Sequence, residues 1–176
     1  MANVINKNNK ILLYSVHTPG YNTKEWIINP SLPGCEKKYW KIEGELVKEM
    51  TSQEKAVIDG QELNVLKELR KSETDDEANR RIGTSAQAGD IGTFLNIPGW
   101  KKDNYILKAN ELIEKKAFGG TLTAQEQATL DALKNIWSQA KDIRNRSDVI
   151  KDDISALSNI DDVKSYDIKH SIRWTE

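Results

Sequence analysis

The sequence predicts an α+β protein that is mainly α-helical: a small N-terminal strand and hairpin element, then helices, a long amphipathic helix and an extended C-terminal arm. Short apolar segments separated by turn residues fill residues 10–50, helix-start motifs follow, and apolar residues at helical spacing run along the last third. At 176 residues the chain suits one domain, or a small domain with an extended element. We expect three regions: the strand element in 1–50, a helical region with an ordered loop in 51–120, and the long helix with the arm in 121–176.

The first region contains short strand candidates bounded by turns. Ile11–Val16 and Trp26–Ile28 are apolar segments that each end at a proline-containing turn. Tyr39–Ile42 and Leu46–Met50 predict a hairpin. Gly44 at its tip readily adopts the positive φ that a tight turn needs.

The hydrophobic pattern changes at Thr51. Thr51 and Glu54 fit a capping box, in which each side chain bonds the backbone N–H of the other residue. A helix is expected to follow, with a kink or break at Gly60, because glycine costs about 1 kcal/mol relative to alanine inside a helix. Lys71–Arg81 has no apolar stripe beyond one alanine, which predicts a solvated helix end or a mobile linker. The apolar positions of this helix are Ile58, Val65, Leu66 and Leu69.

Gly83–Trp100 is rich in small residues and predicts an ordered loop. The apolar residues expected to hold the loop in place are Ile91, Phe94, Leu95, Ile97 and Trp100. Asp103 is expected to cap a short helix that ends at Phe118, where Gly119 and Gly120 follow. The residues expected to point inward are Ile106, Leu107, Leu112 and Ile113.

A second capping box lies at Thr123 and Glu126. The sequence around it, Leu122–Asp131, is similar to the sequence around the first capping box, Met50–Asp59. The similarity indicates either a duplicated unit or two good helix starts that converged, and we favour convergence.

The C-terminal helix carries a heptad-like seam, interrupted by one polar residue, Ser147, where the helix either continues or breaks. The seam suits an oligomeric coiled coil, but an intrachain helical hairpin gives nearly the same pattern. After Ile160 the chain is short of helix signals and is expected to form an extended arm, docked by Ile168, Ile172 and Trp174. The seam consists of Leu133, Ile136, Ala140, Ile143, Ser147, Ile150, Ile154 and Leu157.

Composition argues against several classes of protein. With 26 basic and 27 acidic residues and a net charge of −1, there is no electrostatic reason to expect nucleic-acid binding. Cys35 is the single cysteine, so no intrachain disulfide forms, as suits a reducing cytosol. Signal-peptide features and a bilayer-length apolar run are missing from the sequence. We therefore expect a soluble protein made in the cytosol, with neither nucleic acid nor a membrane as partner.

Chemistry-bearing motifs are sparse. The two histidines, His17 and His170, lie near opposite termini, and no local motif pairs either with a nucleophile such as Cys35. The acidic pairs lack the pattern of a calcium loop, and the glycines lack the spacing of a phosphate-binding loop. We predict no catalytic, cofactor-binding or metal-binding residues and no cofactor.

The five tryptophans are spread along the chain and serve either the core or contacts between subunits, where tryptophan is enriched. Trp26 and Trp174, in irregular segments near the termini, are the favoured contact residues. Together with the heptad seam they predict a partner interface formed by Trp26, Trp40, Ile136, Ile143, Ile150, Ile154, Leu157 and Trp174.

The segment Trp26–Asp59 combines an Asn-Pro-x-Leu element, a Lys-Tyr-Trp strand, a glycine-containing turn, and Glu-Met-Thr leading to Glu-Lys and an aspartate. In this chain these are Asn29, Pro30, Leu32, Lys38, Tyr39, Trp40, Gly44, Glu49, Met50, Thr51, Glu54, Lys55 and Asp59. The pattern covers about a fifth of the chain and resembles a segment of tailed-bacteriophage virion proteins, especially those of marine and cyanobacterial phages. More loosely, a second set of residues resembles the C-terminal helix of some phage tail-associated proteins, without their leucine pair between the arginine and Ser-Asp. That set is Trp137, Arg144, Arg146, Ser147 and Asp148.

The resemblance implies a non-enzymatic structural component of the virion, made in the host cytoplasm, such as a tail, neck or fibre-attachment protein. Its partners would be other virion proteins and copies of itself, and a heptad seam suits a trimer. The alternatives are a capsid-surface accessory or head-fibre protein, and a soluble helical assembly chaperone or binding protein that does not enter the particle. An enzyme using His17, His170 or Cys35 ranks behind these.

Overall fold

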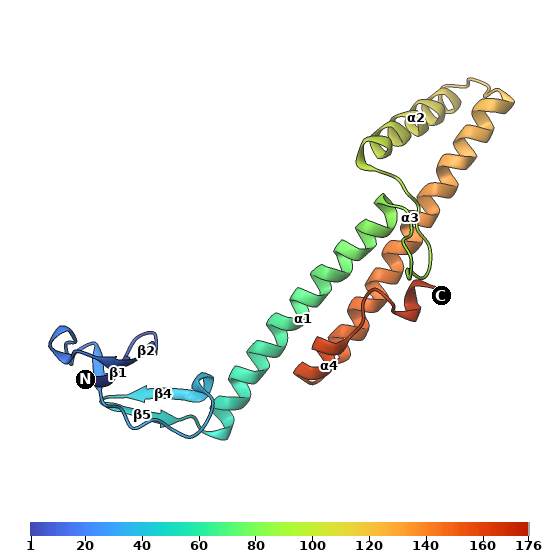
Figure 1. Cartoon of the computed structure of the whole chain (residues 1–176). Coiled ribbons are helices and arrows are strands. Elements are labelled where there is room, and N and C mark those ends of the chain that lie inside the picture. The colour runs from blue at the N-terminus through green and yellow to red at the C-terminus, as the bar shows by residue number, and fades with distance from the viewer. Residues whose placement is uncertain (176) are drawn as a thin grey trace. The chain divides into compact units, whose positions relative to one another are not determined.

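The structure is a computed structural model that describes residues 1–175 (Figure 1). It confirms the predicted class, with 57% helix and 12% strand and with the strands preceding the helices. The chain divides into two compact units, Met1–Glu62 and Leu63–Glu176, called here the N-terminal and C-terminal units. The boundary lies inside the first helix, α1 (Ser52–Gly83).

The N-terminal unit begins with a three-stranded antiparallel sheet of order β2-β1-β3. Its strands are β1 (Ala2–Asn6), β2 (Leu12–Val16) and β3 (Trp26–Ile28). The sequence predicted β2 and β3 but missed β1, which occupies the centre of the sheet. Val4 and Ile5 in β1 are fully buried, yet two apolar residues between asparagines are too short a signal to predict a strand.

The predicted hairpin is present as β4 (Trp40–Glu43) and β5 (Leu46–Glu49). Gly44 at the turn has a φ of +62°, as the sequence predicted. A small core forms where the buried side chains of both sheets meet. Its members are Ile5, Ile27, Trp40 and Val47.

Polar contacts join the hairpin to the start of α1. The Tyr39 hydroxyl donates to Asp59 Oδ1 at 2.7 Å, and Lys38 Nζ lies 3.1 Å from the same oxygen. Both contacts lower the pKa of Asp59. The capping box is formed as predicted, with Thr51 N–H donating to Glu54 Oε2 at 2.7 Å and Glu54 N–H to Thr51 Oγ1 at 3.3 Å. Three residues of the segment Trp26–Asp59, namely Lys38, Tyr39 and Asp59, therefore hold the chain before β4 against the helix.

Helix α1 corrects two expectations. It runs unbroken through Gly60, and the Lys71–Arg81 segment is neither a solvated end nor a linker, since four of its residues are buried. These are Thr74, Glu77, Ala78 and Arg81. Because they are small or polar, hydropathy cannot detect this packed face. Conversely, Val65 and Leu69, expected to serve as apolar packing positions, are exposed.

The C-terminal unit continues with α2 (Gly99–Ala117), α3 (Ala124–Ala156) and the short α4 (Ile160–Ser165). Helix α2 starts at Gly99, with Pro98 as its N-cap, rather than at Asp103. Its predicted end is correct, because Phe118 caps it and Gly119 has a φ of +80°.

Helix α3 runs unbroken through Ser147. The tail after residue 156 is not a purely extended arm, because α4 and a 3₁₀ turn at Ile172–Trp174 interrupt it. A helix of one or two turns leaves too little periodic pattern to be predicted from sequence.

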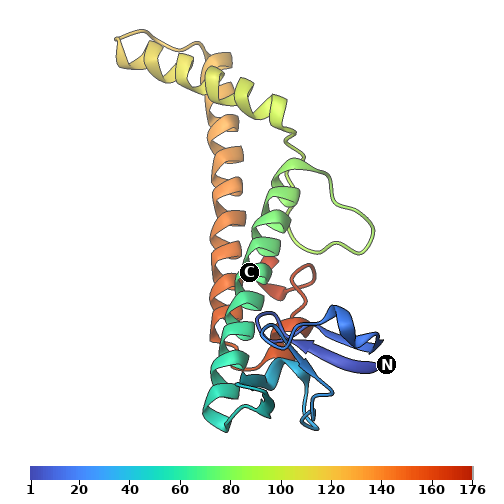
Figure 2. The same cartoon turned by 90° about the vertical axis from the view of Figure 1, so that its left-hand side faces the viewer.

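Helix α3 lies beside the C-terminal part of α1 (Figure 2), and the arm folds back over both. The core there consists of Ala78, Ile143, Ile150, Ile154, Ile168 and Trp174. The three isoleucines of α3 belong to the heptad seam. This part of the seam is therefore intramolecular, which decides between the two interpretations that the spacing left open.

A buried arginine fastens the arm. Arg81 is fully buried, with its guanidinium 4.3 Å from the ring centre of Trp174 and 4.7 Å from that of Phe94. Its Nε lies 2.9 Å from Glu77 Oε1, and its Nη2 donates to the Lys169 carbonyl at 2.9 Å. Burial lowers the pKa of Arg81, so the buried cation depends on these partners.

The predicted capping box of α3 leads to an expected pH dependence. Glu126 accepts from Lys115 Nζ at 2.7 Å and from the Thr123 backbone N–H at 2.8 Å. These bonds lower the pKa of Glu126 from 4.5 to about 2. The stability that they contribute is present above pH 4.5 and is lost as the pH falls from 4.5 towards 2.

Denaturant unfolding of the wild type and of Glu126→Gln as a function of pH measures this contribution. The difference in free energy of unfolding between the two proteins should shrink across that acid range. A constant difference would contradict the assigned role of Glu126.

Candidate functional site: an apolar groove between α2 and α3

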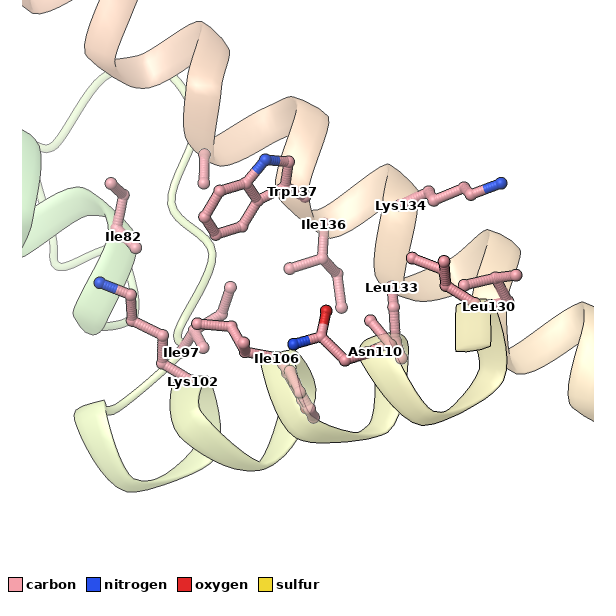
Figure 3. A pocket seen from close by; sticks show the side chains of 14 residues that line it. Ile82, Ile97, Lys102, Ile106, Asn110, Leu130, Leu133, Lys134, Ile136 and Trp137 are labelled. Atoms are coloured by element: carbon pink, nitrogen blue, oxygen red, sulfur yellow. The ribbon is translucent and has the colours of Figure 1, made fainter. Parts of the chain in front are cut away.

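An apolar groove of about 350 Å³ lies between α2 and α3 (Figure 3). Ile106 of α2 and Ile136 and Trp137 of α3 point into the space between the helices. Further lining residues include Ile82, Ile97, Tyr105, Ala109, Ile113, Leu130, Leu133 and Ala140. The volume falls in the range of pockets that hold small ligands or side chains of a partner.

The groove exists because two helices alone cannot enclose a core. The C-terminal half of α3 is covered by α1 and the arm, whereas the first half packs on α2. Among the described residues, Leu112 is the one buried residue of α2, and Leu130 is the one buried residue in the first half of α3. Bundles bury their apolar faces with three or more helices, so this pair leaves an unfilled seam.

Charged side chains border the groove. Lys102 from α2 and Lys134 from α3 are among its lining residues, and both are exposed. Trp137 is 60% exposed, an unusual state for the largest apolar side chain. The site can bind an apolar surface that carries negative charge nearby.

A second apolar surface lies on another face of α2. Trp100 and Leu107 are each 67% exposed and Phe118 is 89% exposed. Spacings of seven and eleven residues place the three along one line of the helix. Trp100 was expected to pin the preceding loop and Leu107 to point inward. Both expectations are wrong, because α2 has a packing partner on one side alone.

The eight residues predicted as a partner interface differ in exposure. Five are buried within their own unit: Trp40, Ile143, Ile150, Ile154 and Trp174. Their burial removes them from any surface that a partner can reach in this conformation. Ile136 lines the groove, and Trp26 and Leu157 are partly exposed. For these three, a contact with a partner stays a prediction.

Sequence reasoning missed the groove and the outer surface of α2. Ile106 and Ile113 were expected to be buried core residues, yet they line the groove and are 38% and 48% exposed. A usable signal was available, because α2 has apolar residues on two faces, with Ile106 and Ile113 about 100–120° around the axis from Leu107. A helix with one neighbour buries one face.

The candidate nucleophile and bases are not among the residues that line the groove. Cys35 is partly buried against the core of the N-terminal unit, and His17 in the same unit is exposed. In the C-terminal unit, His170 Nδ1 lies 2.9 Å from Asp167 Oδ2 on the surface.

Within residues 1–175, no cluster of three or more histidine, cysteine or acidic side chains is placed to hold a metal ion. Over the same residues, none of the helices has both the length and the apolar character to cross a bilayer. Comparison of the chain with protein-family models, curated proteins and solved structures finds no match.

Proposed function

We propose that this chain is a non-enzymatic structural protein of a tailed-bacteriophage particle, a tail, neck or fibre-attachment component that acts by assembly in several copies. The observation that carries the assembly role is the unpartnered apolar surface of α2 and α3. Six apolar side chains of this surface are 38–89% exposed: Ile106, Ile113 and Trp137 in the groove, and Trp100, Leu107 and Phe118 on the other apolar surface of α2. Exposing them is costly for a free monomer, and such surfaces mark interaction sites.

The particle itself is proposed from the resemblance over Trp26–Asp59. The structure gives part of that segment a physical role, because Lys38 and Tyr39, which directly precede β4, contact Asp59 of α1. Such a connection suits a module that presents a small β element on a long helix.

Mass spectrometry of density-gradient-purified particles tests the proposal. We expect peptides of this chain to co-purify with the particles at a stoichiometry comparable to that of known structural proteins. If the chain is abundant in lysates of infected cells yet absent from the particles, the virion role is contradicted. That result would favour the alternative of a soluble assembly chaperone.

A further inference from the structure

We propose that copies of this chain associate head to tail, with the outer stripe of α2 from one copy seated in the α2–α3 groove of the next. The outer stripe is defined as Trp100, Asp103, Leu107, Glu111, Glu114 and Phe118. This inference rests on the proposed multi-copy assembly and names the contact that would produce it.

The outer stripe has the form of a helix face that docks in a groove. Its members recur at spacings of three and four, so all lie within about 40° of the line through Leu107. Apolar anchors at such spacings are how an amphipathic helix occupies an apolar groove. Here the anchors are Trp100, Leu107 and Phe118, the three most exposed apolar side chains of the α2 segment.

Charge complementarity selects a second copy as the occupant. Three acidic residues, Asp103, Glu111 and Glu114, lie among the anchors of the stripe, and all are exposed. Two lysines also touch the stripe: Lys108 pairs with Glu111 at 3.0 Å, and Lys101 lies over the Trp100 ring. Both come from the side of α2 away from the groove residues Ile106 and Ile113. The groove is bordered by Lys102 and Lys134. Seating the stripe in the groove therefore brings carboxylates towards ammonium groups while the apolar anchors leave water, a combination that fixes orientation as well as affinity.

The alternative symmetric contacts lack this match. Placing two grooves face to face would bring Lys102 and Lys134 of one copy towards the same lysines of the other. Placing two outer stripes together would oppose their carboxylates. Like charges at an interface suppress such pairings.

The buried area is adequate for a specific contact. Two aromatic side chains bury roughly 300–500 Å² between them, which is about half of the approximately 800 Å² per partner in a standard interface. Leu107 and the neighbouring turns of α2 supply further area. The expected association is therefore specific but dependent on concentration.

The two surfaces lie on different sides of one helix, because the groove residues Ile106 and Ile113 are about 100–120° around the axis from Leu107. One copy can thus offer its stripe to one neighbour and its groove to another at the same time. Such a heterologous contact generates a closed ring or a helical array. This is the symmetry that repeated parts of a tubular or ring-shaped assembly need.

The test uses the purified full-length chain and sedimentation velocity over a dilution series. We expect the mass to rise above the 20.0 kDa of one chain as concentration increases. Leu107→Asp disables the stripe and Trp137→Glu disables the groove, so each variant alone should stay monomeric. Mixed together they retain one working stripe and one working groove, and should form a 1:1 dimer that grows no further.

Val149→Asp is the matched control, because Val149 is a 43% exposed apolar residue of α3 outside both surfaces, and it should assemble like the wild type. Circular dichroism confirms that the variants remain folded. A wild-type chain that is monomeric throughout overturns the inference, and so does association of either single variant, which would reveal a symmetric contact. Because the test needs no particle, its failure leaves the particle measurement to decide the proposed function separately.

Discussion

Replacing Trp174 with alanine is expected to lower the free energy of unfolding of the C-terminal unit by about 3–5 kcal/mol. Trp174 is 1% exposed, and its Nε1–H donates to the Ile168 carbonyl at 2.6 Å. It contacts the Arg81 guanidinium on one side and belongs to the core formed with α3 on the other. The variant therefore loses apolar burial, a hydrogen bond and the cover over a buried cation.

Urea unfolding followed by circular dichroism measures this effect. Trp137→Ala is the matched control, because the same side chain at that position is 60% exposed, and it should cost less than about 1 kcal/mol. Limited proteolysis adds a local measurement, since the residues after 156 should become susceptible in Trp174→Ala. Equal destabilisation by the two variants would contradict the assignment of Trp174 as the anchor of the arm.

Replacing Arg81 with alanine should be of similar size, about 3–5 kcal/mol, the range for removing one partner of a buried ion pair. The change leaves the Lys169 and Ile91 carbonyls without their donor and removes the cation from between two aromatic rings. Arg81→Lys should recover little, because an ammonium lacks the planar fork that reaches both carbonyls while stacking on the rings.

Arg144→Ala is the control for this prediction. Arg144 is exposed, and its Nη2 lies 3.5 Å from the Asn79 side chain, so its loss should change the free energy of unfolding by less than about 1 kcal/mol. If Arg81→Lys unfolds like the wild type, the positive charge alone would be enough, and the stacked, forked geometry would be irrelevant to stability.

These two variants also separate stability from assembly. Arg81 and Trp174 are buried in the C-terminal unit, whereas the outer stripe and the groove of the α2–α3 hairpin are exposed. A defect caused by loss of the arm should therefore appear in unfolding measurements. A defect at the outer stripe should appear in sedimentation with the unfolding free energy unchanged.

The features that the sequence predicts well are local. Both capping boxes, the turn at Gly44 and the end of α2 at Phe118 depend on residues within a few positions of one another. Their geometry is set by backbone sterics and short-range hydrogen bonds. The strand at Trp26–Ile28 was predicted on the same basis. Secondary-structure class follows from such signals, and the α+β prediction is confirmed for this reason.

Features that depend on distant partners could not be predicted in this way. Strand β1 is a strand because β2 and β3 pair with both of its edges, and the polar segment around Arg81 is buried because Trp174, ninety-three positions later, stacks on it. The spacing of the α3 seam is the same whether its partner lies within the chain or in another copy. Part of the seam is buried within the chain because α1 and the arm cover it. The groove arises in the same way, since α2 has a single neighbour.

By itself, then, the sequence determined the fold class, the starts and turns of its main elements, and the resemblance that directs the functional proposal. The tertiary structure alone decided which apolar residues are hidden and which remain exposed to a partner. The physical reason is that periodicity reports that a helix has an apolar face but not what covers it. Burial is a property of two surfaces that meet, and the second surface is often encoded far along the chain.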